Sequence, residues 1–272
     1  MLNDYKRPVI SISILIVIIV LCYASPILIG GNTTYMYLAD INQAPSGSHF
    51  FGTDNLGRDI FKMIWSGGMV SITIGFLATL VSSFIAIIYG TVSGMSNRFV
   101  DGALMRTTDI ILSIPGILLV IFIQALTGPA SVFSLSVVIG LTSWMNMSKL
   151  VRVEVHQIKN SDYILSARLM GASLPHVIRH HLMPNFLPSI MFMIITNIGA
   201  AMATEATLSF MGIGLSLDTV SWGSMMALSE KALLTNSWWV IIIPGLFLVT
   251  TIVCVTNIGE YVRSRNSINY IT

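Results

Sequence analysis

Residues 69–94 read MVSITIGFLATLVSSFIAIIYGTVSG, a stretch without a charged side chain. An α-helix needs about 20 apolar residues to cross the hydrocarbon core of a bilayer. The apolar residues here are continuous and do not alternate with polar ones, which excludes a spanning β-strand. The stretch therefore predicts a transmembrane helix.

Five further stretches satisfy the same criterion, so we expect an all-α, polytopic membrane protein with six transmembrane helices. The composition agrees, because 54% of the 272 residues are hydrophobic, 10% are charged and the mean hydropathy is +0.81. A net charge of +2 gives no reason to expect a nucleic-acid partner. The six predicted spans are residues 9–29, 69–94, 104–126, 132–150, 188–211 and 238–262.

The basic residues are distributed unevenly between the two sides of these spans. Short loops rich in lysine and arginine remain in the cytoplasm, so we expect both termini to be cytoplasmic. The expected cytoplasmic group is Lys6, Arg7, Arg98, Arg106, Lys149, Arg152, Lys159, Arg168, Arg179, Arg263 and Arg265. The opposite group is Arg58, Lys62 and Lys231.

The spans divide the chain into three parts. Residues 1–68 form an N-terminal anchor and an extracytoplasmic segment, and residues 69–263 form a transmembrane core with a cytoplasmic loop at about 152–187. Residues 264–272 form a cytoplasmic tail. An outer loop is expected at residues 212–237, and Trp222, Trp238 and Trp239 are expected to anchor the chain at the membrane interface.

Sequence signatures of catalysis are absent. No lysine follows a glycine, so the chain lacks the P-loop that binds nucleotides. It also lacks Gly-x-Ser-x-Gly and His-Glu-x-x-His, so we expect no enzymatic activity and no bound cofactor. His176, His180 and His181 lie close in sequence, but no nearby ligand completes a metal shell, and we expect a solvated helix there.

The cytoplasmic loop predicts two short helices. Residues 161–172 form the first, and Gly171 can adopt the left-handed conformation that ends it. A second is expected to begin at Pro175 and to end near Met183, before Pro184. An apolar stripe suits docking into the groove of a partner subunit, or binding to lipid. Its predicted members are Tyr163, Ile164, Ala167 and Met170.

Residues 162–173 (DYILSARLMGAS) and 178–185 (IRHHLMPN) resemble the EAA loop of binding-protein-dependent ABC importer permeases. Residues 51–59 (FGTDNLGRD) and 205–214 (EATLSFMGIG) resemble signatures of the dipeptide/oligopeptide/nickel branch, in particular its C-type subunit. Residues 100–109 and 221–223 also fit this branch. The glutamate and first alanine of the EAA name are Leu165 and Ser166 here, so we expect no salt bridge from position 165.

The resemblance implies the MetI-like fold of type I ABC importers and a location in the bacterial cell membrane. It also implies a heterodimer with a second homologous permease, two cytoplasmic ABC ATPases that hold ATP and Mg, and an extracytoplasmic solute-binding protein. The implied ATPase-coupling residues are Asp162, Tyr163, Ala167, Arg168, Gly171, Ala172, Pro184 and Asn185. The implied extracytoplasmic motif comprises Gly52, Asp54, Gly57, Arg58 and Asp59.

Asp109 lies in the third predicted span and Glu205 in the fifth, where ionisable groups are costly. Asp109 follows Arg106 by three residues, so we expect a local ion pair with a structural role. Glu205 can line a pathway and attract a cationic solute, or it can hydrogen-bond to another helix. We favour the structural role, because the resembled motif carries an acid here in permeases for different substrates.

We therefore expect one permease subunit of an ATP-driven importer that takes up peptides, nickel or metal chelates. An alternative is an ion-coupled secondary transporter or channel, in which Glu205 and Asp109 are the ion-binding groups. A membrane scaffold without transport activity is a third hypothesis. The sequence leaves the choice among dipeptide, oligopeptide and nickel open.

Overall fold

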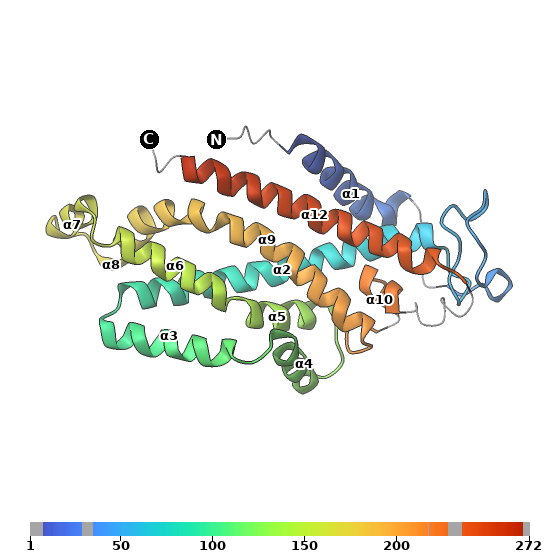
Figure 1. Ribbon diagram of the computed structural model, residues 1–272, viewed down its shortest axis with the longest axis horizontal. Helices are drawn as coiled ribbons and strands as arrows, with labels where there is room; N and C mark the ends of the chain where they lie inside the picture. The colour runs from blue at the N-terminus through green and yellow to red at the C-terminus, as the bar shows by residue number, and fades with distance from the viewer. Residues whose placement is uncertain (1–7, 29–34, 217, 228–235, 269–272) are drawn as a thin grey trace.

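A computed structural model describes residues 8–28, 35–216, 218–227 and 236–268 (Figure 1). These residues contain helices and turns, with an isolated bridge between Thr53 and Asp59 and no strand, so the all-α prediction is confirmed for them. The longest helices run along the long axis of an elongated bundle. Lys6, Arg7, Lys231 and the end of the predicted tail lie outside the described residues.

The helices in chain order are α1 (Val9–Leu28), η1 (Leu38–Asp40), α2 (Ile60–Met95), α3 (Arg98–Leu112), α4 (Gly116–Thr127), α5 (Val132–Ser143), α6 (Met145–Ile158), α7 (Asp162–Leu169), α8 (Leu174–Val177), η2 (Ile178–Leu182), α9 (Met183–Phe210), α10 (Trp222–Ala227) and α12 (Trp239–Ile268). Within the described part of the chain, four helical runs are long and apolar enough to cross a membrane. They are α1, α2, the run that ends with α9, and α12. The bent pair α3–α4 makes five if it counts as one span.

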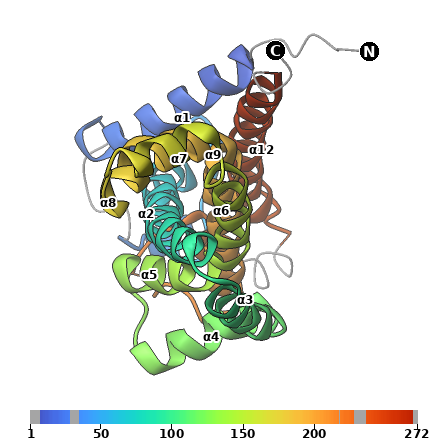
Figure 2. The same cartoon turned by 90° about the vertical axis from the view of Figure 1, so that its left-hand side faces the viewer.

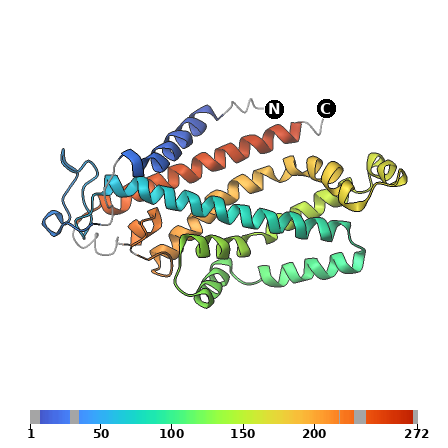
Figure 3. The ribbon, with the colours of Figure 1, turned by 180° about the vertical axis from the view of Figure 1, so that it is seen from behind.

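α2 is the central helix of the bundle and contacts α1, α5, α6 and α9 (Figure 3). It begins nine residues before the predicted span because Asp59 caps it by accepting from the N–H groups of Phe61 and Lys62. Gly90 and Gly94 allow α6 to approach closely. A Cβ at Gly90 would lie 2.5 Å from the carbonyl oxygen of Ser148.

The third predicted span, residues 104–126, is wrong as a single helix. α3 and α4 meet at 87°, and Pro115 stands at the start of α4. Proline disfavours helical geometry in the residue before it and fits the start of a helix, which explains a sharp corner here. The fourth span, residues 132–150, is likewise interrupted at Trp144, where α5 ends and α6 begins.

The fifth span begins earlier than predicted, and the predicted helix end before Pro184 is wrong. The chain stays helical from Pro175 to Phe210. η2 is a π-helical turn in which the N–H of Met183 donates to the carbonyl of Ile178. Pro184 lies directly after this π turn, at the start of α9.

The two ends of the bundle are built differently. α7 and α8 lie at one end and face the viewer in Figure 2, whereas residues 35–59 and α10 lie at the other. At that second end, the prediction of interfacial anchors is wrong for two tryptophans, because Trp222 and Trp239 are buried. Their indole N–H groups donate to the carbonyls of Ile64 (2.9 Å) and Thr53 (3.0 Å). Trp238 is 52% exposed.

Candidate functional site

α7 is held on the bundle by two side chains from one face. Ile164 is fully buried and Ala167 is nearly so. Ile164 belongs to an apolar cluster with residues of α6, η2 and α9, including Val155, Leu182 and Phe186. The helix is therefore packed against the C-terminal end of α6 and the start of α9.

The end of α7 follows the geometry expected from the sequence. Gly171 has φ +86°, which confirms the predicted left-handed conformation. The N–H of Ala172 donates to the carbonyl of Ala167 at 3.0 Å, which is the long closing bond of a Schellman motif. A Cβ at Gly171 would meet no atom within 4 Å, so the requirement for glycine comes from the backbone angle.

The outer face of α7 is apolar and uncovered in this chain. Leu169 and Met170 are 88% and 82% exposed, and Tyr163 and Leu165 are about half exposed. The predicted single stripe is therefore wrong, since Ile164 and Ala167 point into the bundle. The spacing of 165 and 169 indicated a second apolar line four residues apart, and the sequence reasoning missed it.

The other predicted coupling residues occupy two places. Asp162 is exposed in the first turn of α7, and the backbone of Arg168 lies in the last. Pro184 and Asn185 are exposed in the first turn of α9, beyond the π turn. The Nδ2 of Asn185 donates to the carbonyl of His181 in η2. The EAA-like segment thus forms α7, a tight turn, α8, η2 and the start of α9.

A cluster around Asp101 ties three helices together near the α7 end, and the sequence reasoning missed it. Arg152 of α6 donates through Nε and Nη2 to the two carboxylate oxygens of Asp101 in α3. Ser93 of α2 donates to Oδ1 at 2.6 Å, and Nε2 of His156 lies 3.3 Å from Oδ2. Arg152 and His156 are four apart in α6, which is the one sequence signal that they share a face.

Asp109 pairs with a different cation from the one expected. Its carboxylate accepts from Lys149 of α6, so the predicted local pair with Arg106 is wrong. The pairing depends on tertiary structure: α3 packs against α6, which places Lys149 beside Asp109 although the two are 40 residues apart in sequence. Both side chains are substantially exposed, so we expect this ion pair to contribute little to the stability of the fold.

Glu205 lies buried in α9 among hydroxyl groups. Its carboxylate accepts from Ser71 of α2 (3.0 Å), Ser209 of α9 (2.9 Å) and Ser221 before α10 (2.7 Å). The group joins three segments and is shielded from any solute. These three hydrogen bonds favour a structural role for Glu205, which stays a prediction.

The residues of the 51–59 motif bond mainly to one another. Asp54 and Arg58 form a buried ion pair at 2.7 Å, and Asp59 caps α2 and pairs with His49 at 2.9 Å. Gly52 and Gly57 have positive φ, and a Cβ at Gly57 would lie 1.8 Å from the carbonyl oxygen of Tyr37. The motif is a compact, internally hydrogen-bonded loop at the start of α2.

The histidines near η2 stack rather than surround a common point. The rings of His176 and His180 lie 4.3 Å apart and nearly parallel, and His181 meets His176 edge-on. Among the residues that the structure describes, no group of three His, Cys, Asp or Glu side chains is placed to hold a metal ion.

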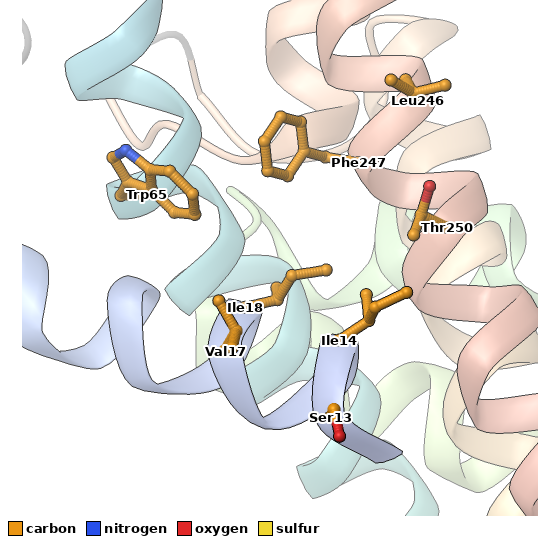
Figure 4. A pocket seen from close by; sticks show the side chains of 8 residues that line it. All are labelled: Ser13, Ile14, Val17, Ile18, Trp65, Leu246, Phe247 and Thr250. Atoms are coloured by element: carbon orange, nitrogen blue, oxygen red, sulfur yellow. The ribbon is translucent and has the colours of Figure 1, made fainter. Parts of the chain in front are cut away.

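An apolar groove of about 410 Å³ lies between α1, α2 and α12 (Figure 4). Carbon atoms dominate its lining, which includes Trp65 and Phe247. Such a surface suits contact with hydrocarbon and offers little to a hydrophilic solute. Its lining residues are Ser13, Ile14, Val17, Ile18, Trp65, Leu246, Phe247 and Thr250.

The chain is similar in sequence to known permeases. It is 32% identical over 259 residues to the dipeptide transport system permease protein DppC of Bacillus subtilis (strain 168), covering 95% of this chain and 81% of that protein. It is also 32% identical over 254 residues to the oligopeptide transport system permease protein OppC of the same organism, covering 93% and 81%. A putative peptide permease protein of Brucella suis biovar 1 is 30% identical over 227 residues, covering 83% and 75%.

Residues 86–268 match the family described as "Binding-protein-dependent transport system inner membrane component". The match covers α3 to α12 and therefore includes α7, the Asp101 cluster and Glu205. Together with the apolar helices, it identifies a multi-pass protein of the bacterial inner membrane. The chain belongs to the family of binding-protein-dependent ABC transporter permeases.

Proposed function

We propose that this chain is one of two different permeases that together form the translocation pathway of an ATP-driven peptide importer. The observation that carries the proposal is the uncovered apolar face of α7, fixed to the bundle by Ile164 within a family of ABC permeases. The names of the Bacillus subtilis relatives support peptides as the solute. Nickel and metal chelates remain the competing solutes.

In this proposal the chain crosses the membrane six times, with the bent pair α3–α4 and the pair α5–α6 each forming one span. Both termini and α7 are then cytoplasmic, and residues 35–59 are external. The anchor (1–68), the core (69–263) and the tail (264–272) keep their expected roles. The distribution of basic residues supports this orientation.

The orientation can be measured by thiol labelling in intact cells. A chain with Cys22→Ser and Cys254→Ser receives either Ser48→Cys or Ser173→Cys, two exposed positions at opposite ends. A membrane-impermeant maleimide should label position 48 directly and position 173 only after permeabilisation. The reverse pattern would contradict the orientation.

The partners in the proposal are a second permease, two cytoplasmic ATPases that bind ATP and Mg, and an external solute-binding protein. The face formed by Leu165, Leu169 and Met170 docks in a groove of one ATPase. Closure of the ATPases draws α7 with it, and the buried Ile164 passes this movement to α6 and α9. The pathway then opens toward the binding protein.

The function is tested by reconstituting the complete complex in proteoliposomes. Peptide uptake should require ATP and the binding protein and should survive an uncoupler. The purified permease alone should hydrolyse no ATP. Uptake that survives ATP depletion and collapses with an uncoupler would identify a secondary transporter instead.

The solute is tested on the cognate binding protein. A thermal shift assay compares dipeptides, longer peptides, nickel ions and chelated nickel at equal concentrations. A rise of Tm with peptides and not with nickel supports the proposal. Stabilisation by nickel alone would replace peptide by metal as the solute.

A further inference from the structure

The long helices expose different kinds of side chain to their surroundings. α1, α2 and α12 expose large apolar residues, as expected for contact with lipid; they include Ile16, Val20, Leu80, Phe84, Ile88, Leu246, Val249 and Val253. Between Phe192 and Ser209, the exposed positions of α9 are instead Ala200 and Thr207, with Thr196 and Asn197 half-buried beside them. This small, polar face is poorly suited to lipid.

A pocket of about 330 Å³ opens beside the polar face of α9. Its volume lies at the lower end of the range for small-molecule sites, roughly 300–1,000 Å³. None of the side chains around it is charged. The lining residues are Ser143, Asn146, Met147, Met193, Thr196, Asn197 and Ala200.

The backbone is irregular at the same place. The interruption at Trp144 separates Ser143 from Asn146, so the break between α5 and α6 borders the pocket. Within a membrane, broken helices are tolerated where they line a cavity or are buried in protein. Asn197 contacts Thr79 and Ser82 near the middle of α2, which puts the pocket near the middle of the bundle.

The orientation of the Asn197 amide follows from its neighbours. Ser82 donates to the carbonyl of Thr79 at 3.1 Å, and its oxygen accepts from the Nδ2 of Asn197. The Nδ2 of Asn197 therefore points at α2 and donates to Ser82 (2.9 Å) and Thr79 (3.2 Å). Both amide protons are used, and the Oδ1 of Asn197 keeps its capacity to accept.

The hydroxyl groups of the pocket are also left as acceptors. Ser143 donates its proton to the carbonyl of Ile139 at 2.8 Å, and Thr196 donates to Phe192 at 2.9 Å. The exposed amide of Asn146 bonds to no other described residue, so it can rotate to accept or donate. The lining thus offers several neutral acceptors and few free donors.

We propose that this pocket between α5, α6 and α9 lines the translocation pathway and binds passing peptides through their N–H groups. Neutral acceptors suit backbone amides and a terminal ammonium, and the absence of lining charges leaves the side chains of the peptide unselected. The methionines provide adaptable apolar contact for those side chains. This inference rests on the proposed function.

The first experiment measures peptide uptake per ATP hydrolysed in proteoliposomes that contain the complete complex. Asn146→Leu and Thr196→Val should each lower this ratio about threefold to tenfold, because each removes a hydrogen bond to the passing peptide. The matched control is Thr256→Val, a half-buried threonine of α12 with the same intrahelical bond at 2.8 Å. Unchanged ratios in both pocket variants would overturn the inference.

The wild-type complex distinguishes a failure of the proposed function from a failure of this inference alone. If it shows no ATP-driven peptide uptake, the proposed function fails, and this inference fails with it. If it transports peptide while both pocket variants match the control, only the inference fails. Each variant is first compared with wild type in its thermal midpoint in detergent, so that a folding defect is not counted as a transport defect.

The second experiment tests whether water reaches the pocket in the assembled complex. In the Cys22→Ser/Cys254→Ser chain, a thiol introduced by Asn146→Cys should react with a charged thiosulfonate reagent, and excess peptide during turnover should slow the reaction at least threefold. A thiol introduced by Phe84→Cys on the apolar face of α2 should not react. Labelling at 146 in the isolated chain but not in the complex would show that a partner helix covers the pocket, which overturns the inference.

Discussion

Residues 51–59 and residues 162–185 carry two family-like motifs and lie at opposite ends of the bundle (Figure 1). In the first, polar side chains bond to one another and to the start of α2, and Asp54 and Arg58 are buried. In the second, the helix is fixed by Ile164, and Leu169 and Met170 face outward. The polar side chains of the first motif are paired within the chain, whereas the second motif leaves an exposed apolar surface to which a partner can bind.

This difference predicts opposite outcomes for mutations in the two segments. A change in 51–59 should lower stability, with loss of transport as a consequence. A change on the outer face of α7 should spare stability and weaken assembly.

Arg58→Met should have the largest effect. It leaves the buried Asp54 carboxylate without its cation, and breaking such a pair costs about 3–5 kcal/mol. The thermal midpoint in detergent should fall sharply. The double variant Asp54→Asn/Arg58→Met should lose less unfolding free energy than the two single variants lose in sum, because the two side chains interact. Full additivity would contradict the assigned contact.

Gly57→Ala should follow, at about 3 kcal/mol, because left-handed strain adds to overpacking. The residue has φ +73°, and the added Cβ would lie 1.8 Å from the carbonyl oxygen of Tyr37. The measurement is again the thermal midpoint. Gly47→Ala is the matched control, since Gly47 is exposed just before the 51–59 motif and an added Cβ there would meet no atom within 4 Å. Equal midpoints for the two variants would refute the packing argument.

Gly171→Ala should cost about 1 kcal/mol, because only the left-handed angle is strained and no neighbour is displaced. The comparison with Gly57 isolates the steric part of the penalty. Gly102→Ala in α3 has open space and ordinary helical geometry, so it should be neutral or slightly stabilising. A loss at Gly171 as large as that at Gly57 would show that the turn is packed by something else.

The same two segments show why sequence reasoning succeeded in part. The left-handed Gly171 was predictable because a helix end depends on neighbouring residues. The face that α7 buries was not, since it depends on Phe186 and other residues of a separate helix. The ion pair of Asp109 was not predictable for the same reason. No sequence pattern indicates that Lys149, forty residues away, lies beside it.

The apolar spans were predictable from composition, but their breaks were not. Pro115 and Pro184 are chemically alike in the sequence, yet one stands at an 87° corner and the other lies inside a continuous helical run. The π turn at η2 accommodates Pro184, and no local sequence pattern predicts that turn. Backbone irregularities of this kind depend on tertiary packing.

Leu169→Ser should have the smallest effect on stability and the largest on assembly. The side chain is 88% exposed, so its loss removes almost no contact within the chain, and the thermal midpoint should stay unchanged. Burying a leucine against a partner contributes about 1.5–3 kcal/mol, so the amount of ATPase that copurifies with the permease should fall about tenfold or more. Leu38→Ser, at the opposite end and 76% exposed, is the control and should leave copurification intact. Normal copurification of Leu169→Ser would mean that this face of α7 meets lipid or solvent, and the contrast between the two motifs would lose its functional meaning.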